Sequence, residues 1–504
     1  MRLDDRRLFW VVWVVLCGAL LPLSLSPIDW WPLAFVSIGG WFYALHRGVL
    51  PAWLSGWLYG AGKYAVGVSW VYGSIHEFGE ETVLVSGLLV ALFVAGLSLF
   101  SMVQAWMFKL ASSTSLVRNA FSFVAVWVVA EWLLTWFLTG FPWLLPGYAV
   151  IDTTLVNFAP VAGVLLVSAI VVLIACSAVV VLAGPQRIRF ATLVVGPWLV
   201  ALSLGQIEWV QPVETRTAAL VQGNVAQGSK WDFENRQPIV RRYLKLSDPH
   251  WDVDVLVWPE AAITYFEHEA TALLDELDRR GRQTGAALVM GIASVEFLPG
   301  GDYTMHNTAI SLGAGASRNN RSRYIKRHLV PFGEYVPLQD MLRGLISFFD
   351  LPMSATQPGP MHQPPLVIGD LKAAMAICYE VVYSEMMRAP ARESDVLITV
   401  TNDTWFGTSI GPWQHMQMAR MRAVENGRWL LRGTNNGVSV IVDHHGQISH
   451  TMPQFEEGVL RGDFQVMQGS TLFNRFGHGW LVALSLLGWG LAGVIQRVRR
   501  VHSR

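Results

Sequence analysis

Long apolar runs alternate with short polar loops over roughly the first two hundred residues and again near the end of the chain. A helix needs about 20 residues to cross a hydrocarbon core of about 30 Å, and most of these runs reach that length. The second and seventh runs are shorter, so each could be kinked or only partly inserted. The pattern predicts eight spans, at Leu8–Leu25, Trp30–Leu45, Leu50–Gly73, Thr82–Phe108, Asn119–Leu138, Pro160–Ala183, Ala191–Leu204 and Trp480–Ile495.

Basic residues lie in every second loop of this pattern. The start of the chain resembles a signal peptide, but no small-residue cleavage site follows, so we expect an uncleaved first helix. Because basic loops face the cytoplasm, eight spans place both termini there and the segment between spans seven and eight outside it. The residues concerned are Arg6, Arg7, Arg47, Lys109, Arg118, Arg187, Arg189, Arg497, Arg499, Arg500 and Arg504.

Residues 212–468 have the mixed composition of a globular domain and lie between the N-terminal bundle, residues 1–211, and a last helix with a basic tail, residues 469–504. Helical patterns, at Ala270–Thr284 and Trp413–Asn426, alternate with short apolar runs, which predicts an α/β layered fold. The predicted strands are Ala218–Gln222, Val253–Trp258, Ala287–Gly291, Thr308–Leu312, Ala373–Ile377, Val396–Thr401 and Val438–Val442.

The composition supports a membrane protein, with 52% hydrophobic residues, 15% charged residues and 23 Trp. The aromatic residues are best explained by interfacial belts. A net charge of +0 and the lack of a basic domain argue against a nucleic-acid partner. Cys17 and Cys176 lie in apolar runs and are expected to pack as small hydrophobic residues. No cluster has metal-ligand spacing, so neither a metal nor a cofactor is expected.

Three groups suited to acyl transfer stand at the ends of apolar runs in the globular segment. Cys378 supplies a thiol nucleophile, Glu260 a carboxylate base and Lys326 a cation for an oxyanion. A buried cysteine alone is usually inert, so the combination carries the argument. Reactive side chains in α/β folds lie where strands end, so we expect these residues and Asn402-Asp403 to line the mouth of one site.

The residues around these groups resemble two nested families. Trp258-Pro259-Glu260, the Lys326 segment and Cys378-Tyr379-Glu380 resemble the Glu-Lys-Cys triad of the nitrilase superfamily. Longer strings resemble bacterial apolipoprotein N-acyltransferases over nearly the whole chain, although Thr404 replaces the small residue expected there. These strings are Ser69-Trp70-Val71-Tyr72, Gly140-Phe141-Pro142-Trp143, Val330-Pro331-Phe332-Gly333-Glu334-Tyr335-Val336-Pro337, Asn402-Asp403-Thr404-Trp405-Phe406-Gly407, Gly411-Pro412-Trp413-Gln414-His415 and Thr434-Asn435-Asn436-Gly437.

The resemblance implies an αββα sandwich on the periplasmic side of a bacterial inner membrane, acting as a monomer. It also implies a ping-pong reaction, in which Cys378 takes an acyl chain from a membrane phospholipid as a thioester. The α-amine of the diacylglyceryl-cysteine of an apolipoprotein then attacks that thioester. Glu260 would act as the base in both steps, and Lys326 would stabilise the oxyanion.

Further residues match the family pattern, and two roles are possible for most of them. Glu334 is expected as a second carboxylate near the thiol and the lysine, or as a salt bridge holding its loop. Tyr379 and Glu380 either take part in chemistry or orient the loop. The helix bearing His415 is expected to be structural.

The substrate-binding residues predicted from the chain are aromatic or polar side chains on loops. Trp231 is expected to lie on a substrate loop, with ordinary packing as the alternative. Asn402 and Trp405 are expected to shape the pocket, with a core or turn role as the alternative. Phe348 and Phe349, within Leu342–Leu351, are expected to line a lid, with a core helix as the alternative. In the bundle, Lys63 and Glu131 are ionisable groups in apolar spans and are expected to pair or to function.

Two other functions use the same residues. A membrane-tethered amidase of the nitrilase type would use water as the acceptor. A non-catalytic domain would bind lipoproteins or act as a scaffold, and an intact triad argues against that reading. A pocket open to the bilayer favours acyl transfer, whereas a narrow polar pocket favours the amidase.

Overall fold

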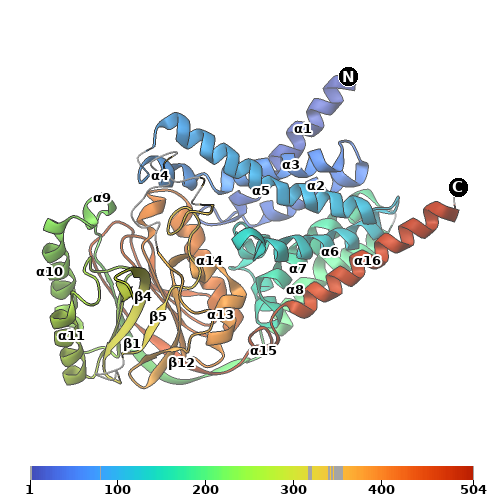
Figure 1. Ribbon diagram of the computed structural model, residues 1–504. Helices are drawn as coiled ribbons and strands as arrows, with labels where there is room; N and C mark the ends of the chain where they lie inside the picture. Colours follow the sequence, from blue (N-terminus) through green and yellow to red (C-terminus); the bar gives the residue numbers. More distant parts are fainter. Residues whose placement is uncertain are drawn as a thin grey trace. The chain divides into compact units, whose positions relative to one another are not determined.

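The structure is a computed structural model that describes residues 3–79, 81–184, 186–315, 321–338, 341, 344 and 356–502. The chain forms two compact units, which we treat separately (Figure 1). The helical unit comprises Met1–Tyr72, Val83–Glu208 and Phe476–Arg504. The α/β unit comprises Trp209–Arg475 together with the short segment Gly73–Thr82.

Helices occupy all eight positions at which the sequence predicts spans, and six of them are long and apolar enough to cross a membrane. The exceptions are α2 and α3, with 16 residues each. The third predicted span is interrupted after Gly67 and continues as α4. The helices are α1 (Leu3–Leu20), α2 (Pro32–Arg47), α3 (Ala52–Gly67), α4 (Trp70–His76), α5 (Val83–Ala111), α6 (Leu116–Leu134), α7 (Ala159–Ala183), α8 (Arg187–Leu204) and α16 (Gly479–His502).

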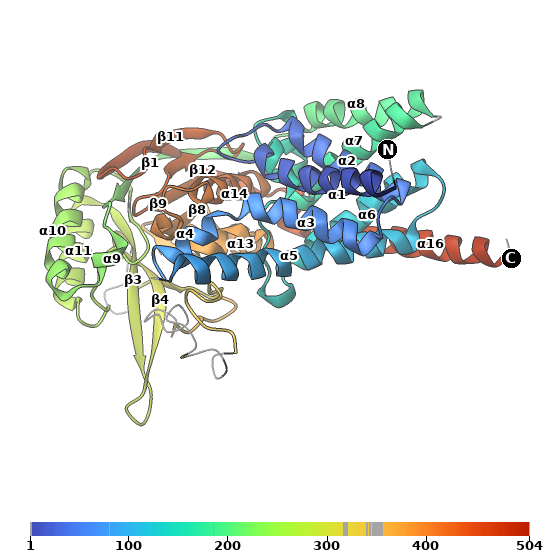
Figure 2. The ribbon, with the colours of Figure 1, turned by 90° about the horizontal axis from the view of Figure 1, so that it is seen from above.

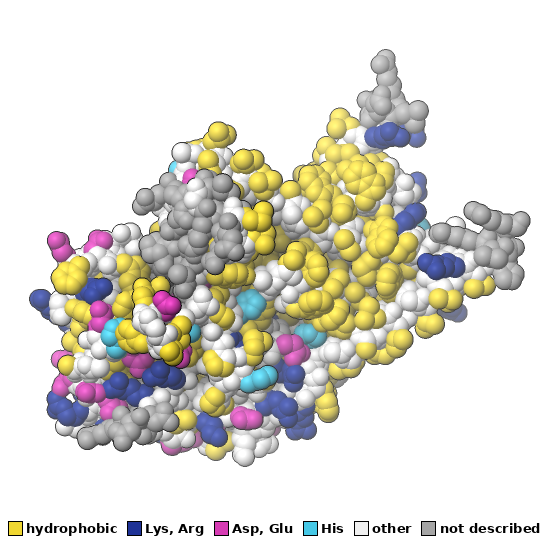
Figure 3. Space-filling view, viewed as in Figure 1, with side chains coloured by type: hydrophobic (Ala, Val, Ile, Leu, Met, Phe, Trp, Pro, Cys, Tyr) yellow, Lys and Arg dark blue, Asp and Glu magenta, His cyan; other side chains and the backbone are white. Residues whose placement is uncertain are grey.

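Small residues bring α1 and α3 into close contact. A Cβ atom on Gly18 would lie 2.0 Å from the carbonyl oxygen of Tyr59, and one on Gly62 would lie 2.1 Å from that of Val15. Such close backbone approach is how membrane helices pack without a hydrophobic driving force. The visible outer face of this unit is covered largely by hydrophobic side chains (Figure 3), as expected for a surface in contact with lipid.

Two six-stranded mixed sheets form the centre of the α/β unit. The first has the order β12-β1-β2-β3-β4-β5, and β3 and β4 extend beyond their neighbours as a long hairpin (Figure 2). Its strands are β1 (Val210–Gln222), β2 (Val255–Trp258), β3 (Ala287–Phe297), β4 (Tyr303–Gly313), β5 (Arg323–Ile325) and β12 (Gly458–Gly469). The second has the order β11-β10-β9-β8-β7-β6, with β6 (Leu366–Ile368), β7 (Leu371–Ile377), β8 (Val396–Thr401), β9 (Leu430–Thr434), β10 (Ser439–Val442) and β11 (Ile448–Met452).

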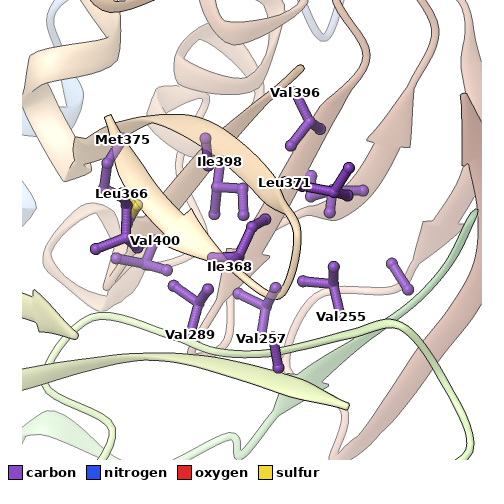
Figure 4. Close-up of a cluster of buried hydrophobic side chains, with 14 of the residues drawn as sticks. Val255, Val257, Val289, Leu366, Ile368, Leu371, Met375, Val396, Ile398 and Val400 are labelled. Carbon is purple, nitrogen blue, oxygen red and sulfur yellow. The ribbon is translucent and has the colours of Figure 1, made fainter. Parts of the chain in front are cut away.

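The sheets pack face to face with helices outside, which confirms the predicted αββα layering. Val257 and Val289 of the first sheet meet Ile398 and Val400 of the second in the core between them (Figure 4). A second cluster joins the first sheet to α10 (Arg236–Ser247) and α11 (Thr271–Thr284). Helices α13 (Ser384–Ala391) and α14 (Gly411–Asn426) contact β7 and β9 of the second sheet.

The direction of the strands determines where polar groups gather. Strands β1, β2 and β3 run parallel, as do β7, β8 and β9. β5 is antiparallel to β4, which is antiparallel to β3, so β5 ends at the same edge as β3. The residues that follow β2, β5, β7 and β8 therefore meet at one end of the sandwich. These are the positions of Glu260, Lys326, Cys378 and Asn402.

Candidate active site

Glu260 lies just beyond β2, in a turn packed closely against β3. A Cβ atom on Gly291 would lie 2.6 Å from the Cα atom of Glu260, so only glycine leaves room for this turn. Glu260 is buried, with 7% of the residue exposed, and its carboxylate receives donors on both oxygens. Asn307 donates to Oε1 over 2.7 Å, and the backbone N–H of Asn402 donates to Oε2 over 2.9 Å. Glu260 is thus fixed from both sheets.

Lys326 follows β5 and is almost fully buried between two carboxylates. Its Nζ atom lies 2.8 Å from Oε1 of Glu334 and 3.4 Å from Oε1 of Glu260. Burial favours the neutral amine, but the charges of Glu334 and Glu260 outweigh it, so the pKa of Lys326 is raised above its ordinary value. The side chain is therefore a fixed cation. Asn307 also donates to Glu334, over 3.2 Å, and so links the two carboxylates.

Cys378 begins a short turn, η9 (Cys378–Val382), directly after β7. Its φ angle is +54°, a left-handed conformation that is rare for residues other than glycine. The residue is only partly exposed. Burial and the charge of Glu260 raise the pKa of its thiol, whereas Lys326 acts in the opposite direction. The resting thiol is therefore protonated at neutral pH, and reaction requires a base to remove its proton.

Glu380 is buried and connects the nucleophile turn to the loop of Lys326. Its Oε1 atom accepts the hydroxyl of Tyr324 over 3.0 Å and the backbone N–H groups of Arg327 and His328 over 2.8 and 3.1 Å. Oε2 accepts the backbone N–H of Ile377 over 2.8 Å. These four donors favour the reading in which Glu380 orients the loop.

Tyr379 lies in an aromatic cluster next to the nucleophile. Its ring centroid is 5.3 Å from that of Tyr383 and 6.0 Å from that of His328. Glu334 fits both of its readings, because it pairs with Lys326 and also accepts the backbone N–H of Val330 over 2.9 Å, which holds its own loop.

Asn402 joins the base to two neighbouring loops. Besides its backbone contact with Glu260, its side-chain amide donates to Gln227 over 2.7 Å. Its Oδ1 atom accepts the hydroxyl of Thr404 and the amide of Asn435, over 2.8 and 3.1 Å. Asn402 is therefore a structural centre of the site rather than an exposed contact residue.

The two predicted tryptophans lie on loops beside this centre. Trp231 ends α9 (Gln227–Lys230) and is 37% exposed. Trp405 lies in η10 (Asp403–Phe406), where its carbonyl accepts the hydroxyl of Ser74 over 2.7 Å and its ring lies 5.6 Å from that of Phe78. Phe348 and Phe349 lie outside the described residues.

Sequence patterns did not predict two residues of the site, the partly buried Asn307 and the buried Lys230. Asn307 lies within β4, and its partners are distant in sequence, so no local pattern reveals it. Lys230 is 1% exposed, and its Nζ atom donates to the carbonyl oxygen of Glu260 over 3.5 Å. Burial lowers the pKa of Lys230 to about 8, against the opposing charge of Glu260. A lysine beside a tryptophan, as in Lys230-Trp231, was the only available signal.

Charged residues on the helix of His415 and in the apolar spans have partners outside the triad. On α14, Nε of Arg422 lies 3.0 Å from Oε2 of Glu425, and both side chains are fully buried, as expected for a structural helix. In the helical unit, Glu131 accepts Nε1 of Trp127 over 2.6 Å, and the Lys63 ammonium lies 5.1 Å from the ring centroid of Tyr64. Within the described residues, no group of three or more His, Cys, Asp or Glu is placed to hold a metal ion.

Comparison with known proteins identifies relatives for both units. The carbon-nitrogen hydrolase family matches residues 217–470, and the apolipoprotein N-acyltransferase N-terminal domain matches residues 17–177. The chain is 42% identical to the apolipoprotein N-acyltransferase of Pseudomonas aeruginosa over 487 residues, 94% of each chain. It is 38% identical to that of Vibrio cholerae over 96% of each chain.

Among solved structures, a nitrilase-superfamily protein of Saccharomyces cerevisiae aligns with a TM-score of 0.37 at 18% identity. The alignment covers 51% of this chain and 92% of that protein.

Proposed function

Because the chain belongs to the apolipoprotein N-acyltransferase family, and is thus an acyltransferase that N-acylates lipoproteins, we propose the route by which its residues perform that transfer. The observation that carries the proposal is the meeting of a thiol, a carboxylate and a fixed ammonium at one end of the sandwich. Cys378 is the nucleophile, Glu260 the general base and Lys326 the oxyanion donor.

In the first step, Glu260 takes the thiol proton and the sulfur of Cys378 attacks the ester carbonyl of a membrane phospholipid. Negative charge develops on the carbonyl oxygen, where the Lys326 ammonium stabilises it. The ester C–O bond then breaks, Glu260 returns its proton to the departing alkoxide, and a lysophospholipid leaves. The acyl chain remains on Cys378 as a thioester.

In the second step, the α-amine of the diacylglyceryl-cysteine of an apolipoprotein attacks the thioester. Glu260 accepts a proton from the nitrogen as the amide bond forms. The C–S bond breaks, and the sulfur of Cys378 recovers the proton. Each substrate uses the same pocket in turn, which predicts ping-pong kinetics without a cofactor.

We propose that the ion pair with Glu334 holds the Lys326 ammonium next to Glu260 during both steps. Trp231, Trp405 and the partly exposed Phe332 contribute apolar surface at the pocket entrance. The protein is proposed to act in the inner membrane, because both substrates are held by acyl chains in a bilayer. It is also proposed to act as a monomer, with the α/β unit in the periplasm.

The proposal is tested by supplying phospholipid without an acceptor to purified enzyme and measuring the mass of the peptide containing Cys378. We expect a hydroxylamine-sensitive acyl adduct on wild-type protein and none on Cys378→Ser. Lys326→Met should slow adduct formation by about 10²–10³, as for other oxyanion donors. Glu260→Gln should prevent the adduct, because no base then removes the thiol proton.

The matched control is Glu276→Gln on α11, an exposed position whose carboxylate pairs with Arg279 rather than with a residue of the triad. This variant should form the adduct at the wild-type rate. Normal adducts on both Glu260→Gln and Lys326→Met would refute the assigned roles. Hydrolysis of the adduct without transfer to a lipoprotein N-terminus would favour the amidase.

A further inference from the structure

The backbone of the nucleophile is held in its unusual conformation by a buried histidine. Nε2 of His415, on α14, lies 3.2 Å from the carbonyl oxygen of Cys378. A carbonyl oxygen only accepts hydrogen bonds, so Nε2 carries the hydrogen. A non-glycine residue with φ of +54° is strained, and such strain persists only where the surroundings enforce it. His415 supplies one such restraint.

His415 is itself fixed by a buried ion pair. Its Nδ1 atom lies 3.1 Å from Oδ1 of Asp403 and 3.1 Å from Nη2 of Arg432. Nη2 of Arg432 also donates to Oδ2 of Asp403 over 2.8 Å. The Asp403, His415 and Arg432 side chains are at most 1% exposed. Neither the sheet nor the helix alone would bring these three residues together.

The charges of this cluster favour a neutral imidazole. Asp403 and Arg432 balance each other, so a protonated His415 would add an uncompensated buried charge. Burial and the charge of Arg432 lower the pKa of His415, against the opposing effect of Asp403. In the neutral form with hydrogen on Nε2, Nδ1 accepts from Nη2 of Arg432, which also donates to Asp403. Asp403 therefore orients the ring by holding Arg432 rather than by accepting from Nδ1. The orientation that serves the Cys378 carbonyl is thus the one that the ion pair selects.

The segment that supplies Asp403 to this cluster also holds Glu260, the proposed base. The backbone N–H of Asn402 donates to Oε2 of Glu260, and Asp403 is the next residue. Thr401, the residue before, donates its hydroxyl to Oδ1 of Asp403 over 3.1 Å. The segment from Thr401 to Asp403 therefore contacts Glu260 on one side and, through His415, the backbone of Cys378 on the other.

We propose that His415, oriented by Asp403 and Arg432, is a positioning residue that sets the backbone of Cys378 relative to Glu260. This inference rests on the proposed function of Cys378 and Glu260 and adds a residue that touches neither substrate. Loss of the hydrogen bond from His415 leaves the thiol intact but removes a restraint on the backbone of Cys378. The sulfur then reaches the geometry of attack less often.

Two substitutions that differ by one methylene group test this role. The amide nitrogen of His415→Gln reaches about as far as Nε2 and can still donate to the Cys378 carbonyl. The amide of His415→Asn reaches only as far as Nδ1, so it can contact Asp403 but not Cys378. We expect His415→Asn to lower kcat for Cys378 acylation by about tenfold or more with KM for phospholipid unchanged, and His415→Gln to restore most of that loss.

Met418→Ala, a buried position on the same helix, is the stability control. It should lower the melting temperature while leaving the acylation rate per folded molecule unchanged. Equal rates for His415→Asn and His415→Gln, or a loss explained by folded yield alone, would overturn the positioning role.

If wild-type enzyme forms no adduct, the proposed function fails. Alkylation of Cys378 by iodoacetamide still separates the two variants and so tests the positioning role by itself.

Discussion

At the scale of single residues, the carboxylates of the site differ in how their oxygens are occupied. Glu380 receives four donors, two from strands β5 and β7 and two from the segment that follows Lys326. Glu260 instead receives an amide, a backbone N–H and a shared ammonium at 3.4 Å, the longest of these contacts. A carboxylate that acts as a base needs an oxygen that can accept a proton, and Glu260 meets that requirement better than Glu380.

Lys230 gives a prediction about stability at this scale. Its folded-state pKa of about 8 lies below the ordinary value of 10.5, so the unfolded chain binds more protons between these values. Stability therefore rises with pH across that window, and below about pH 8 the full penalty of burying the ammonium remains. Lys230→Met should raise the melting temperature at pH 7 by removing a penalty of at most on the order of 3 kcal/mol. The gain should shrink towards pH 10.

Scanning calorimetry of detergent-solubilised protein across this pH range measures the effect. Lys245→Met, at an exposed position on α10, should leave the melting temperature unchanged. A gain for Lys230→Met that did not vary with pH would mean that packing, rather than charge, causes it. We also expect slower acyl transfer, because Lys230 is a direct partner of the Glu260 backbone.

Much of the site could be predicted from the sequence because its reactive residues sit inside specific motifs. Glu260, Lys326 and Cys378 each end or follow an apolar run, which is where α/β folds expose side chains. Asn307 could not be predicted, since it is 47 residues from Glu260 and 27 from Glu334 and lies within a strand. His415 was expected to be structural because helix periodicity cannot reveal a contact with a carbonyl oxygen in another element.

At the scale of elements, the segment Gly73–Thr82 is a support for the Trp405 loop. It belongs to the α/β unit although it lies between two helices of the other unit in sequence. Ser74 donates to the carbonyl of Trp405, and Phe78 packs edge-to-face on the indole. A tryptophan held in this way has a defined position next to Asp403 and Asn402.

Removing both contacts should weaken lipid transfer more than folding. For Ser74→Ala with Phe78→Ala, we expect kcat/KM with phospholipid to fall by up to about 30-fold, since a hydrogen bond and an aromatic pair each contribute about 1 kcal/mol. Reaction of Cys378 with iodoacetamide should be unchanged, because the two contacts that these variants remove are with Trp405 rather than with the triad. A parallel fall in both rates would show that the segment supports the whole site rather than its entrance.

Strand prediction succeeded where burial is continuous. β8 was predicted with its observed bounds, because all six residues are buried and apolar or β-branched. β5 and β6 have three residues each and are too short to form a pattern. β9 was missed because Arg432 and Gly433 interrupt its apolar run, and only the ion pair of Arg432 with Asp403 explains why a charged residue is fully buried there.

At the scale of the whole molecule, the distribution of basic loops predicts the orientation of the chain. In a Cys378→Ser background, the remaining cysteines, Cys17 and Cys176, are buried. We expect a membrane-impermeant maleimide to label Asp302→Cys, at the exposed tip of the β3–β4 hairpin, in intact spheroplasts. Thr114→Cys, exposed between α5 and α6, should react only after permeabilisation. The opposite pattern would place the α/β unit in the cytoplasm.

The pairing of β1 with β12 constrains the order in which the protein can fold during synthesis. β1 is the first strand of the α/β unit to leave the ribosome, and its antiparallel partner is the last. Until residue 469 has been made, one edge of β1 is open, and an open edge readily pairs with other chains. A nascent unit that lacks β12 therefore exposes the edge of β1 until shortly before α16 is made. A ribosome stalled just before β12 would present a chain prone to aggregation.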